Sequence, residues 1–477
     1  MKKMINRYFI EKLKDNFPFS LTNDQETATN KIVEFIFNPK SEELFLLKGY
    51  AGTGKSSLIG ALVKTMTELQ QKTVLLAPTG RAAKVFSMYS GQSAFTIHKK
   101  IYRQKSMSDT GASFSLTENL HQNTLFIVDE ASMISNTTTD GSFFGTGRLL
   151  DDLIEYVYAA SNCKLLLLGD TAQLPPVKQE ISPAMDTYEL QSYGLKVSES
   201  TLTEIMRQSE DSGILYNATL LRNALSNGLT RNSPKLKLDN FTDVQRISGN
   251  DLIEEISGCY SRDGFEETVV ISRSNKNVNI YNNGIRNSVL YREEELSNGD
   301  LLMVTKNNYF WLKEEEKVDF IANGEFVEVL RIRSHEEVYG LRFCDVTLHH
   351  KNYDLEFDAK ICLDALHTES SGTSYQQSNM LYAALNEEYA HIGSKGGRYK
   401  QIKNNPYFNA LQVKYGYAVT CHKAQGGEWR NVFIDLGYIN PAHLGDNFYR
   451  WLYTSITRST QMLYLVNLSD EFIAFSD

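Results

Sequence analysis

Three short segments carry glycine, basic and acidic residues at spacings that suit phosphate chemistry. The first, GYAGTGKSS at residues 49–57, matches the pattern G-x-x-x-x-G-K-[ST], whose backbone N–H groups surround a β-phosphate. In this pattern Lys55 reaches the β and γ oxygens, and Ser56 ligates Mg²⁺. The sequence therefore predicts a site for ATP and Mg²⁺, to which the loop also contributes Gly49, Gly52, Thr53, Gly54 and Ser57.

Two acidic residues follow the apolar run of the second segment, TLFIVDE. Asp129 and Glu130 come directly after residues 125–128, and open α/β sheets bind ligands at the carboxyl ends of their strands. Asp129 is expected to hold the metal, and Glu130 to polarise the water that attacks phosphorus. Many strands end in solvated acids, so this interpretation depends on the phosphate loop that precedes it.

Two glutamines are candidates for reading the nucleotide. Gln173 follows the third apolar run, CKLLLLGD, and its amide could donate to a γ-phosphate oxygen and lose that bond after hydrolysis. Gln25 lies in the first turn of a helix expected to begin at Thr22 or Asn23, and an amide can bind N6 and N7 of adenine together. The alternatives are a turn-capping Gln173 and a Gln25 on a helix surface.

The elements that must position these residues alternate between strands and helices. Apolar runs at 44–47, 73–77 and 125–128 predict buried strands. The spacing of Leu58 and Leu62 predicts a helix directly after the phosphate loop. Such alternation is typical of an α/β fold with a parallel sheet. With 477 residues, the chain is long enough for about three domains.

Composition excludes several classes of protein. The content of 42% hydrophobic and 22% charged residues is that of a soluble globular protein. A formal net charge of −9 disfavours a uniformly basic surface, so any nucleic-acid site is expected in a local groove. The five cysteines form no C-x-x-C pair, which favours reduced thiols over disulfides or a zinc site.

The sequence also predicts a cytoplasmic protein without a membrane partner. No apolar run approaches the roughly 18–20 residues that a membrane helix needs. In the first 17 residues charged side chains separate short apolar groups, so the segment lacks the continuous apolar core of a signal peptide and favours a short amphipathic helix.

Four further residues suggest that nucleotide hydrolysis is coupled to movement. Thr79 in APTGRAAK and Thr96 in TIH lie at expected helix starts, where they could bind the phosphates of a nucleic acid or only cap the helix. Arg207 in EIMRQ and Arg458 in TSITR lie far from the phosphate loop. Arginines that reach the γ-phosphate only when two domains close on it can raise the rate about 10³-fold or more.

The ordered set of motifs resembles one family. GYAGTGKS, APTGRAAK, TIH, VDEAS, GDTAQLPPV, EIMRQ, YAVTCHKAQGGEW and YTSITR, in this order, are similar to those of the RecD-like and Dda-like group of superfamily 1 DNA helicases, and of the Pif-type helicases. The resemblance extends from about Leu21 to Val466. It implies two RecA-like domains with ATP between them, single-stranded DNA across both, and 5′-to-3′ translocation.

The resemblance also implies a role for individual residues. Those on the nucleotide side are an adenine reader, the phosphate-loop pair, the metal and water residues, the γ-phosphate sensor and two arginine fingers, namely Gln25, Lys55, Ser56, Asp129, Glu130, Gln173, Arg207 and Arg458. Those on the DNA side are Pro78, Thr79, Thr96, His98, Thr420, His422 and Lys423. The segment that couples strand and nucleotide contains Gln425, Gly426 and Glu428, of which the last two are also predicted to bind nucleotide.

Two insertions are expected in the core domains. From Asn298 onward, short alternating strands with Asn-Gly turns predict a small β-barrel, which resembles the SH3-like insert of the family. A shorter insertion at residues 101–122 is expected to form a β-hairpin pin, with Phe114 as the aromatic on which the splitting base pair stacks. The alternative for Phe114 is closure of a minor core.

A basic segment and one asparagine complete the candidate DNA contacts. Lys395, Arg398, Lys400 and Lys403 surround Tyr399 on an expected glycine-rich loop, which suits a single strand's phosphates and bases or is simply solvated. Asn275, on the turn after a strand predicted at 268–272, suits a phosphate contact.

The expected domain organisation has four parts. They are an N-terminal helix at 1–20, a first RecA-like domain at 21–204, a second at 205–296 and 406–477, and the barrel with its basic loop at 297–405. The helix that carries Gln25 begins near Leu21, whereas family members in recombination nuclease complexes have a docking region before it. A stand-alone, monomeric motor is therefore expected.

The sequence is thus interpreted as an ATP- and Mg²⁺-dependent 5′-to-3′ DNA helicase of a bacterial cytosol or of a phage, serving replication, repair or recombination. Its expected partners are single-stranded DNA and duplex with a 5′ tail, and a single-strand-binding protein or replication and repair proteins are further candidates. The alternatives are a nucleotide-controlled single-strand clamp that remodels bound proteins without unwinding, and an RNA helicase of the same superfamily.

Overall fold

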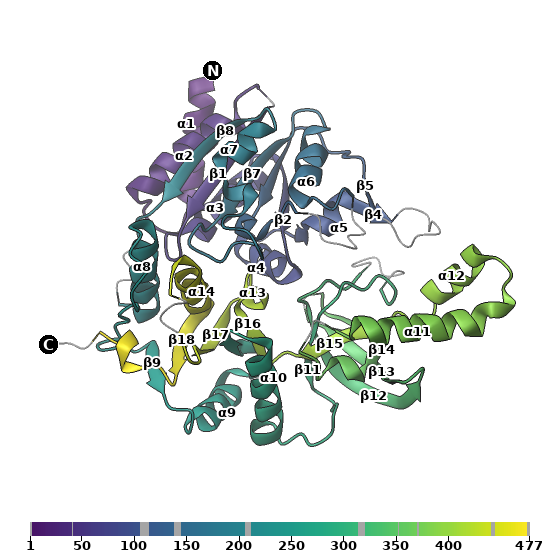
Figure 1. The fold of residues 1–477 in the computed structure, drawn as a ribbon. Coiled ribbons are helices and arrows are strands. Elements are labelled where there is room, and N and C mark those ends of the chain that lie inside the picture. Colours follow the sequence, from purple (N-terminus) through teal and green to yellow (C-terminus); the bar gives the residue numbers. More distant parts are fainter. Residues whose placement is uncertain are drawn as a thin grey trace.

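Two parallel β-sheets, each flanked by helices, form two lobes, and a small barrel adjoins the second lobe (Figure 1). The computed structural model describes residues 2–40, 42–104, 114–137, 145–205, 211–312, 320–351, 353–369, 372–439 and 444–474. The N-terminus lies in the first lobe and the C-terminus in the second. This arrangement confirms the predicted α/β fold with two RecA-like domains and a barrel insert.

The first lobe contains a parallel sheet with the strand order β3-β2-β6-β7-β1-β8. Its strands are β1 (Glu43–Gly49), β2 (Lys72–Ala77), β3 (Ala94–Thr96), β6 (Thr124–Val128), β7 (Lys164–Gly169) and β8 (Lys196–Leu202). Its helices are α1 (Lys2–Asn16), α2 (Asn23–Ile36), α3 (Lys55–Glu68), α4 (Gly80–Ser90), α5 (Ile97–Ile101), α6 (Leu149–Tyr158) and α7 (Thr187–Ser192). Because helices cover both faces of the sheet, β6 and β7 are apolar and buried almost throughout.

The second lobe contains a parallel sheet with the strand order β16-β10-β17-β18-β9. Its strands are β9 (Val244–Ile247), β10 (Thr268–Ser272), β16 (Ala418–Thr420), β17 (Trp429–Asp435) and β18 (Ser459–Val466). Its helices are α8 (Gly213–Ser226), α9 (Leu252–Asp263), α10 (Asn275–Gly284), α13 (Cys421–Ala424) and α14 (Asp446–Ile456). The strand predicted at 268–272 is confirmed, but Asn275 begins α10 instead of lying on a turn.

A closed barrel interrupts the second lobe between β10 and β16. Its strands are β11 (Leu301–Val304), β12 (Phe326–Val338), β13 (Leu341–His350), β14 (Leu355–Cys362) and β15 (Leu411–Tyr415). The last strand pairs with β11 and β14, so the barrel extends beyond residue 405, where the insert was expected to end. The second sheet resumes only at β16.

The basic segment predicted as a loop is a helix. Between β14 and β15 the chain forms α11 (Tyr375–Glu388) and α12 (Lys395–Lys403), which extend from the barrel as an arm (Figure 1). Ser394 caps α12 by accepting a hydrogen bond from the N–H of Gly397. The two glycines therefore lie in the first helical turn, where the cap offsets their low helix propensity.

The predicted hairpin is present, but Phe114 does not have the predicted exposure. β4 (Tyr102–Gln104) pairs antiparallel with β5 (Phe114–Leu116), and residues 105–113 lie outside the described residues. Phe114 is only 7% exposed, and its ring centroid is 4.5 Å from that of Tyr309. In this conformation Phe114 closes a hydrophobic cluster instead of presenting its ring to a base pair.

The cysteines and the N-terminal helix are as expected. All five thiols are free and buried. α1 buries Phe9 and Leu13 against the first lobe, and Phe17, directly after the helix, joins the same cluster. Among the described residues, no helix combines the length and the apolar character that crossing a membrane requires.

Candidate nucleotide site and lobe interface

The phosphate loop joins β1 to α3 and has the backbone turn that its glycines predict. Gly52 and Gly54 have φ angles of 74° and 75°, in the left-handed region that favours glycine. The Nζ atom of Lys55 donates to the carbonyl oxygens of Gly49 at 2.5 Å and Tyr50 at 2.8 Å. A Cβ atom on Gly49 would lie 2.8 Å from the Lys55 side chain, so a glycine here leaves room for the lysine to cross the loop.

Gln25 does not face an open adenine site. It is fully buried in α2, and its Oε1 accepts a hydrogen bond from the N–H of Thr22 in a capping box. Its Nε2 donates to the carbonyl oxygen of Thr53 at 2.9 Å. Thr22 is thus the N-cap, and Gln25 supports the phosphate loop from behind. An adenine contact would require Gln25 to exchange one of these two bonds.

Asp129 lies at the end of β6 with both carboxylate oxygens oriented. Its Oδ2 accepts a 2.6 Å hydrogen bond from the Tyr89 hydroxyl, and its Oδ1 accepts one of 2.8 Å from the N–H of Glu130. Burial and the Asp129 carboxylate raise the pKa of Tyr89 well above its ordinary value, so the phenol stays a donor. A carboxylate and the exposed hydroxyl of Ser56 are oxygen ligands of the kind that Mg²⁺ binds, so these residues fit that ion.

Glu130 combines a constrained backbone with a perturbed carboxyl group. Its φ of 54° is left-handed, which is uncommon for a residue with a side chain. Burial raises its pKa to about 7, Asp129 adds to the rise, and Arg458 and Lys55 oppose it. Its Oε1 lies 3.9 Å from Nη1 of Arg458, which comes from the second lobe. A carboxyl group that titrates near neutral pH suits general-base chemistry.

The loop after β7 brings Gln173 and Asp170 into the same interface. Gln173 is 7% exposed, and its side-chain Oε1 is buried without a hydrogen-bond partner among the described residues. A buried amide atom without a partner is costly, so it marks a position where a ligand could bind. This free atom is an acceptor, whereas the predicted contact with a γ-phosphate oxygen needs the NH2 group of Gln173 as donor, so the sensor role stays a prediction.

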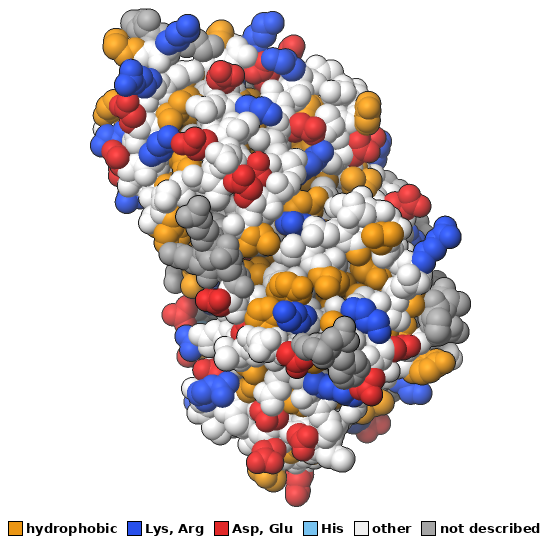
Figure 2. Space-filling view, turned by 90° about the vertical axis from the view of Figure 1, so that its left-hand side faces the viewer, with side chains coloured by type: hydrophobic (Ala, Val, Ile, Leu, Met, Phe, Trp, Pro, Cys, Tyr) orange, Lys and Arg blue, Asp and Glu red, His pale blue; other side chains and the backbone are white. Residues whose placement is uncertain are grey.

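Side chains of the second lobe bind this loop along its length. Arg450 donates to the carbonyl oxygens of Thr171 and, at 3.4 Å, of Gln173. The hydroxyl of Thr454 accepts from the N–H of Leu174 at 2.8 Å. Gln425 donates to the carbonyl oxygen of Leu174 at 2.7 Å. These bonds bring the lobes into close contact. On the face seen in Figure 2, hydrophobic side chains are visible near the junction of the upper and lower parts of the molecule.

One short loop of the second lobe contacts both the predicted finger and α4, the helix that follows the predicted DNA contacts Pro78 and Thr79. Nη1 of Arg458 donates to the carbonyl oxygen of Gly427 at 3.2 Å, and Nη2 of Arg81 in α4 donates to that of Glu428 at 3.0 Å. The Arg81 guanidinium also lies 3.6 Å from the ring centroid of Trp429. Burial lowers the pKa of Arg81 to about 10, which leaves it charged at neutral pH.

Gly426 explains the close approach of this loop to α4. Its φ is 72°, and a Cβ atom there would lie 2.9 Å from Cβ of Ala82 and 3.1 Å from Oγ1 of Thr79. Both the backbone angle and the space therefore favour glycine. The predicted coupling segment thus packs on the helix that follows β2.

The predicted DNA-side residues lie at equivalent places in the two sheets. Pro78 and Thr79 follow β2, Thr96 ends the neighbouring edge strand β3, Asn275 follows β10, and Thr420 ends the neighbouring edge strand β16. Thr79 and Thr96 are both N-caps, which accept hydrogen bonds from the N–H groups of Ala82 and Lys99. The capping alternative is therefore realised for both, and Thr96 is also almost fully buried.

The two predicted histidine contacts are not cationic at neutral pH. Burial lowers the pKa of His98 to about 4, and burial followed by the charge of Lys423 lowers that of His422. Lys423 donates to Oδ1 of Asn323 at 2.5 Å, and burial lowers its pKa. These side chains can offer hydrogen bonds to a nucleic acid, with Lys423 held toward the barrel.

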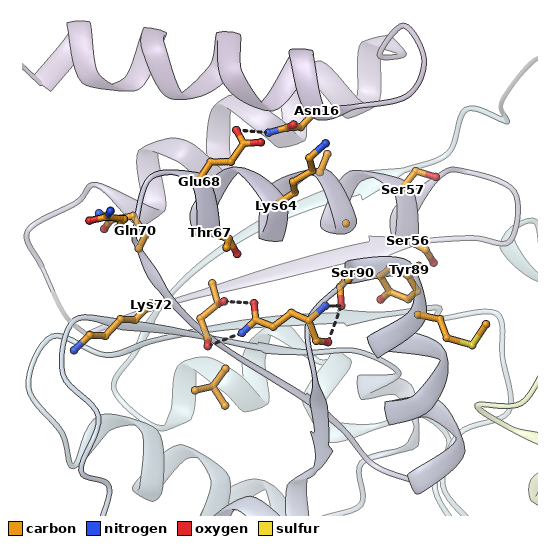
Figure 3. A pocket seen from close by; sticks show the side chains of 18 of the residues that line it. Asn16, Ser56, Ser57, Lys64, Thr67, Glu68, Gln70, Lys72, Tyr89 and Ser90 are labelled. Atoms are coloured by element: carbon orange, nitrogen blue, oxygen red, sulfur yellow. Dashed lines mark hydrogen bonds between the residues drawn. The ribbon is translucent and has the colours of Figure 1, made fainter. Parts of the chain in front are cut away.

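A groove of about 1240 Å³ runs beside the phosphate-loop helix (Figure 3). It is lined by one face of α3, by the end of α4 and by the start of β2, with Ser56 and Tyr89 at one end. Of the predicted nucleotide residues among those described, only Ser56 and Ser57 line it. The predicted hydrolytic residues that the structure describes, Lys55, Glu130, Gln173 and Arg458, lie instead where the two lobes meet.

Four residues near the predicted sites were not singled out from the sequence. One predicted finger cannot be placed. Arg207 lies outside the described residues. Tyr89, Arg81, Asp170 and Tyr453 each contact a predicted site or its loop. Arg81, Asp170 and Tyr453 lie within the motifs APTGRAAK, GDTAQLPPV and YTSITR, so a charged or hydroxyl side chain inside a motif was the signal that could have identified them. Tyr89 follows the helical spacing of α4 and gave no such signal.

Comparison with known proteins identifies the family. The profile described as an AAA domain matches residues 20–248, and that described as the UvrD-like helicase C-terminal domain matches residues 415–466. The ATP-dependent DNA helicase dda of Enterobacteria phage T4 is 24% identical over 475 residues, covering 94% of this chain and 99% of that protein. The chain belongs to the superfamily 1 helicases. The predicted family is confirmed, and within it this helicase groups with the RecD-like and Dda-like members.

Other relatives of this helicase differ in length. The RecBCD enzyme subunit RecD of Buchnera aphidicola subsp. Acyrthosiphon pisum is 24% identical, covering 97% of this chain and 79% of that protein. The ATP-dependent RecD2 DNA helicase of Deinococcus radiodurans is also 24% identical, covering 88% of this chain but 46% of that protein. A crystal structure of Pif1 helicase from Bacteroides in complex with ADP-AlF3 and ssDNA superposes with a TM-score of 0.47 at 14% identity, covering 96% and 95% of the two chains.

Proposed function

We propose that the chain is an ATP-dependent DNA helicase that translocates 5′-to-3′ on single-stranded DNA and unwinds duplex by closing its two lobes on ATP. One observation carries this proposal. Arg458 of the second lobe lies 3.9 Å from Glu130 of the first, and helix α14 just before it also contacts the phosphate loop at Ala51 and the backbone of Gln173. Hydrolysis then depends on how the lobes sit together, which is the requirement for converting it into movement.

The residues of the interface divide the work of hydrolysis. Glu130, with its pKa near 7, accepts a proton from water as the water oxygen attacks the γ-phosphorus, and the bond to the β–γ bridging oxygen breaks to give ADP and phosphate. Lys55 and Arg458 bind the charge that develops on the phosphate oxygens. Gln173 detects the γ-phosphate. A bound Mg²⁺, held by Ser56 and Asp129, would neutralise further charge on the phosphates.

The proposed DNA path runs along the matching edges of the two sheets. Thr79 and Thr96 belong to the edge pair β2 and β3, while Asn275 and Thr420 belong to the edge pair β10 and β16. One strand of DNA bound at both edges would be gripped by each lobe, so that closure moves one grip toward the other. The barrel strands and the basic helix α12 lie on the β16 side of the second sheet (Figure 1).

The choice of substrate and the direction rest on the relatives and on the family resemblance. The T4 and Deinococcus radiodurans relatives are described as DNA helicases, which favours DNA over RNA. Direction follows the 5′-to-3′ branch to which the motifs are similar. The helicase is proposed to act as a monomer in a bacterial or phage-infected cytoplasm, where a single-strand-binding protein is a candidate partner.

Strand displacement tests the whole proposal in one assay. The purified protein is mixed with ATP and Mg²⁺ and with a duplex that has either a 5′ or a 3′ single-stranded tail. The expected result is displacement of the 5′-tailed duplex alone, with Glu130→Gln as the inactive control that still binds DNA. If single-stranded DNA stimulates ATP turnover but neither duplex opens, the chain is a translocase or remodeller, and displacement of the 3′-tailed duplex alone would contradict the direction.

A further inference from the structure

The hydroxyl of Tyr453 joins the second lobe to two loops of the first. Tyr453 lies on α14 and is only 1% exposed. Its hydroxyl accepts a hydrogen bond of 2.9 Å from the N–H of Ala51, the third residue of the phosphate loop. It donates one of 2.5 Å to Oδ2 of Asp170, directly after β7. One oxygen atom therefore bridges the phosphate loop and the loop that carries Gln173.

Both partners of this hydroxyl lie in the first lobe, so the bridge depends on contact between the lobes. Asp170 is also buried, and the hydroxyl of Tyr453 is the donor to its Oδ2, while the N–H of Ala172 donates to its Oδ1. Burial, followed by the charge of Asp170, raises the pKa of Tyr453 well above its ordinary value, so the phenol remains a donor. When the lobes separate, both the carboxylate and the N–H of Ala51 lose a partner.

The rest of α14 acts on the same loop and leads to the finger. Arg450 and Thr454, on the same helix, bind Thr171, Gln173 and Leu174 of that loop. Arg458 follows two residues after the last residue of α14, Ile456, and lies 3.9 Å from Glu130. A movement of α14 would therefore shift the positions of the sensor loop, the phosphate loop and the finger together.

We propose that Tyr453 is a positioning residue, through which the second lobe holds the phosphate loop and the sensor loop in their hydrolytic arrangement when the lobes close on ATP. The hydroxyl does not need to touch the nucleotide for this role. It stabilises the arrangement of the lobes seen here because both of its bonds cross from one lobe to the other. This inference rests on the proposed ATP hydrolysis and names a residue of that reaction that the motifs do not assign.

The test is Tyr453→Phe, which keeps the ring and removes both bonds. The matched control is Tyr449→Phe on the same helix, whose hydroxyl donates to the carbonyl oxygen of Asn232 within the second lobe. The substitution removes a hydrogen bond to a charged group and leaves a buried carboxylate oxygen without that donor. Both effects destabilise the closed state, so kcat of Tyr453→Phe is expected to fall about 10-fold or more. KM for ATP should change less than about threefold, since capture by the open phosphate loop does not use the hydroxyl.

A second variant asks whether the effect passes through the carboxylate. Asp170→Asn should lower kcat by itself, and Tyr453→Phe combined with Asp170→Asn should be no worse than the more severe single change, because contacting residues are not additive. Thermal unfolding of each variant separates loss of folding from loss of closure, since a folded Tyr453→Phe with normal kcat overturns the inference. A rise in KM with unchanged kcat also overturns it, whereas an inactive wild-type protein contradicts the proposed function itself.

Discussion

At the scale of single residues, the interface depends on groups whose protonation is set by burial. Glu130 lies in a left-handed backbone position beside Asp129, and burial moves its pKa to about 7. Tyr89 and Tyr453 are shifted in the direction that keeps them protonated, and each donates to a buried or half-buried aspartate. The site thus contains a carboxyl group, Glu130, that can exchange a proton near neutral pH, and two phenols, Tyr89 and Tyr453, that stay protonated there.

The pKa of Glu130 predicts how ATP hydrolysis depends on pH. A general base must be deprotonated, so kcat should fall as the pH drops through about 7, approaching a tenfold loss per pH unit below it. Steady-state ATPase rates with saturating single-stranded DNA, measured between pH 5.5 and pH 8.5 (the assay range), check this expectation. In Glu130→Gln the rate should fall by about 100-fold or more and lose this pH dependence. A wild-type profile that is flat across this range would contradict the role of Glu130 as the base.

At the scale of elements, α4 and the loop before β17 form the contact between the DNA side and the nucleotide side. Arg81 reaches from α4 to the carbonyl oxygen of Glu428 and stacks on Trp429, while Arg458 binds the preceding carbonyl oxygen of Gly427. Adjacent peptide groups cannot move independently. A displacement of α4 by bound DNA would therefore shift the carbonyl group that holds the finger.

Replacing Arg81 with Ala should weaken this coupling. The stacked guanidinium and its hydrogen bond are together worth about 2–4 kcal/mol, so the ratio of DNA-stimulated to basal ATPase rate should fall at least about 10-fold. The matched control is Lys84→Ala on the same helix, which removes a single bond to the carbonyl oxygen of Lys351 in the barrel. ATPase titrations with oligo(dT) give both the ratio and the half-saturating DNA concentration. Equal ratios in the two variants would contradict the coupling role.

The sequence predicted these elements with uneven success, for physical reasons. Strands β2, β6 and β10 were predictable because parallel strands covered on both faces are continuous apolar runs. Helix α12 was predicted as a loop because two glycines lower helix propensity. The cap from Ser394 that offsets them is a local contact, so the sequence did contain the signal for this helix. Phe114 and Gln25 were assigned by motif or type, but their partners, Tyr309 and Thr53, lie far away or in another loop. Side-chain partners of this kind depend on tertiary packing.

At the scale of the whole molecule, a buried ionic network fixes the barrel to the second lobe. Asp300, which is 0% exposed, accepts two hydrogen bonds of 3.0 Å from Arg286 and one of 2.6 Å from Arg292. The hydroxyl of Tyr417, between the barrel and β16, donates to the same carboxylate at 3.0 Å. This network lies where the chain enters the barrel and where it leaves.

Removing the carboxylate should destabilise the protein strongly. Asp300→Ala leaves two guanidinium groups without their buried partner, and breaking such a pair typically costs about 3–5 kcal/mol. The control is Asp358→Ala, which removes an exposed pair with Arg333 and should cost less than about 1 kcal/mol. Urea unfolding followed by tryptophan fluorescence gives both values. If the two variants unfold at the same urea concentration, the network does not support the barrel as described.

The interruption of the second sheet has a consequence for the order in which the protein can fold during synthesis. Strands β1 to β8 of the first lobe are complete once about residue 202 has been made, whereas β10 meets its neighbours β16 and β17 only after the barrel and the arm have been added. Contacts between such distant segments form slowly. The nascent chain therefore displays an unpaired β10, every residue of which is buried in the folded protein, for the time that the ribosome needs to add about 145 further residues, which makes this strand the expected target of a chaperone.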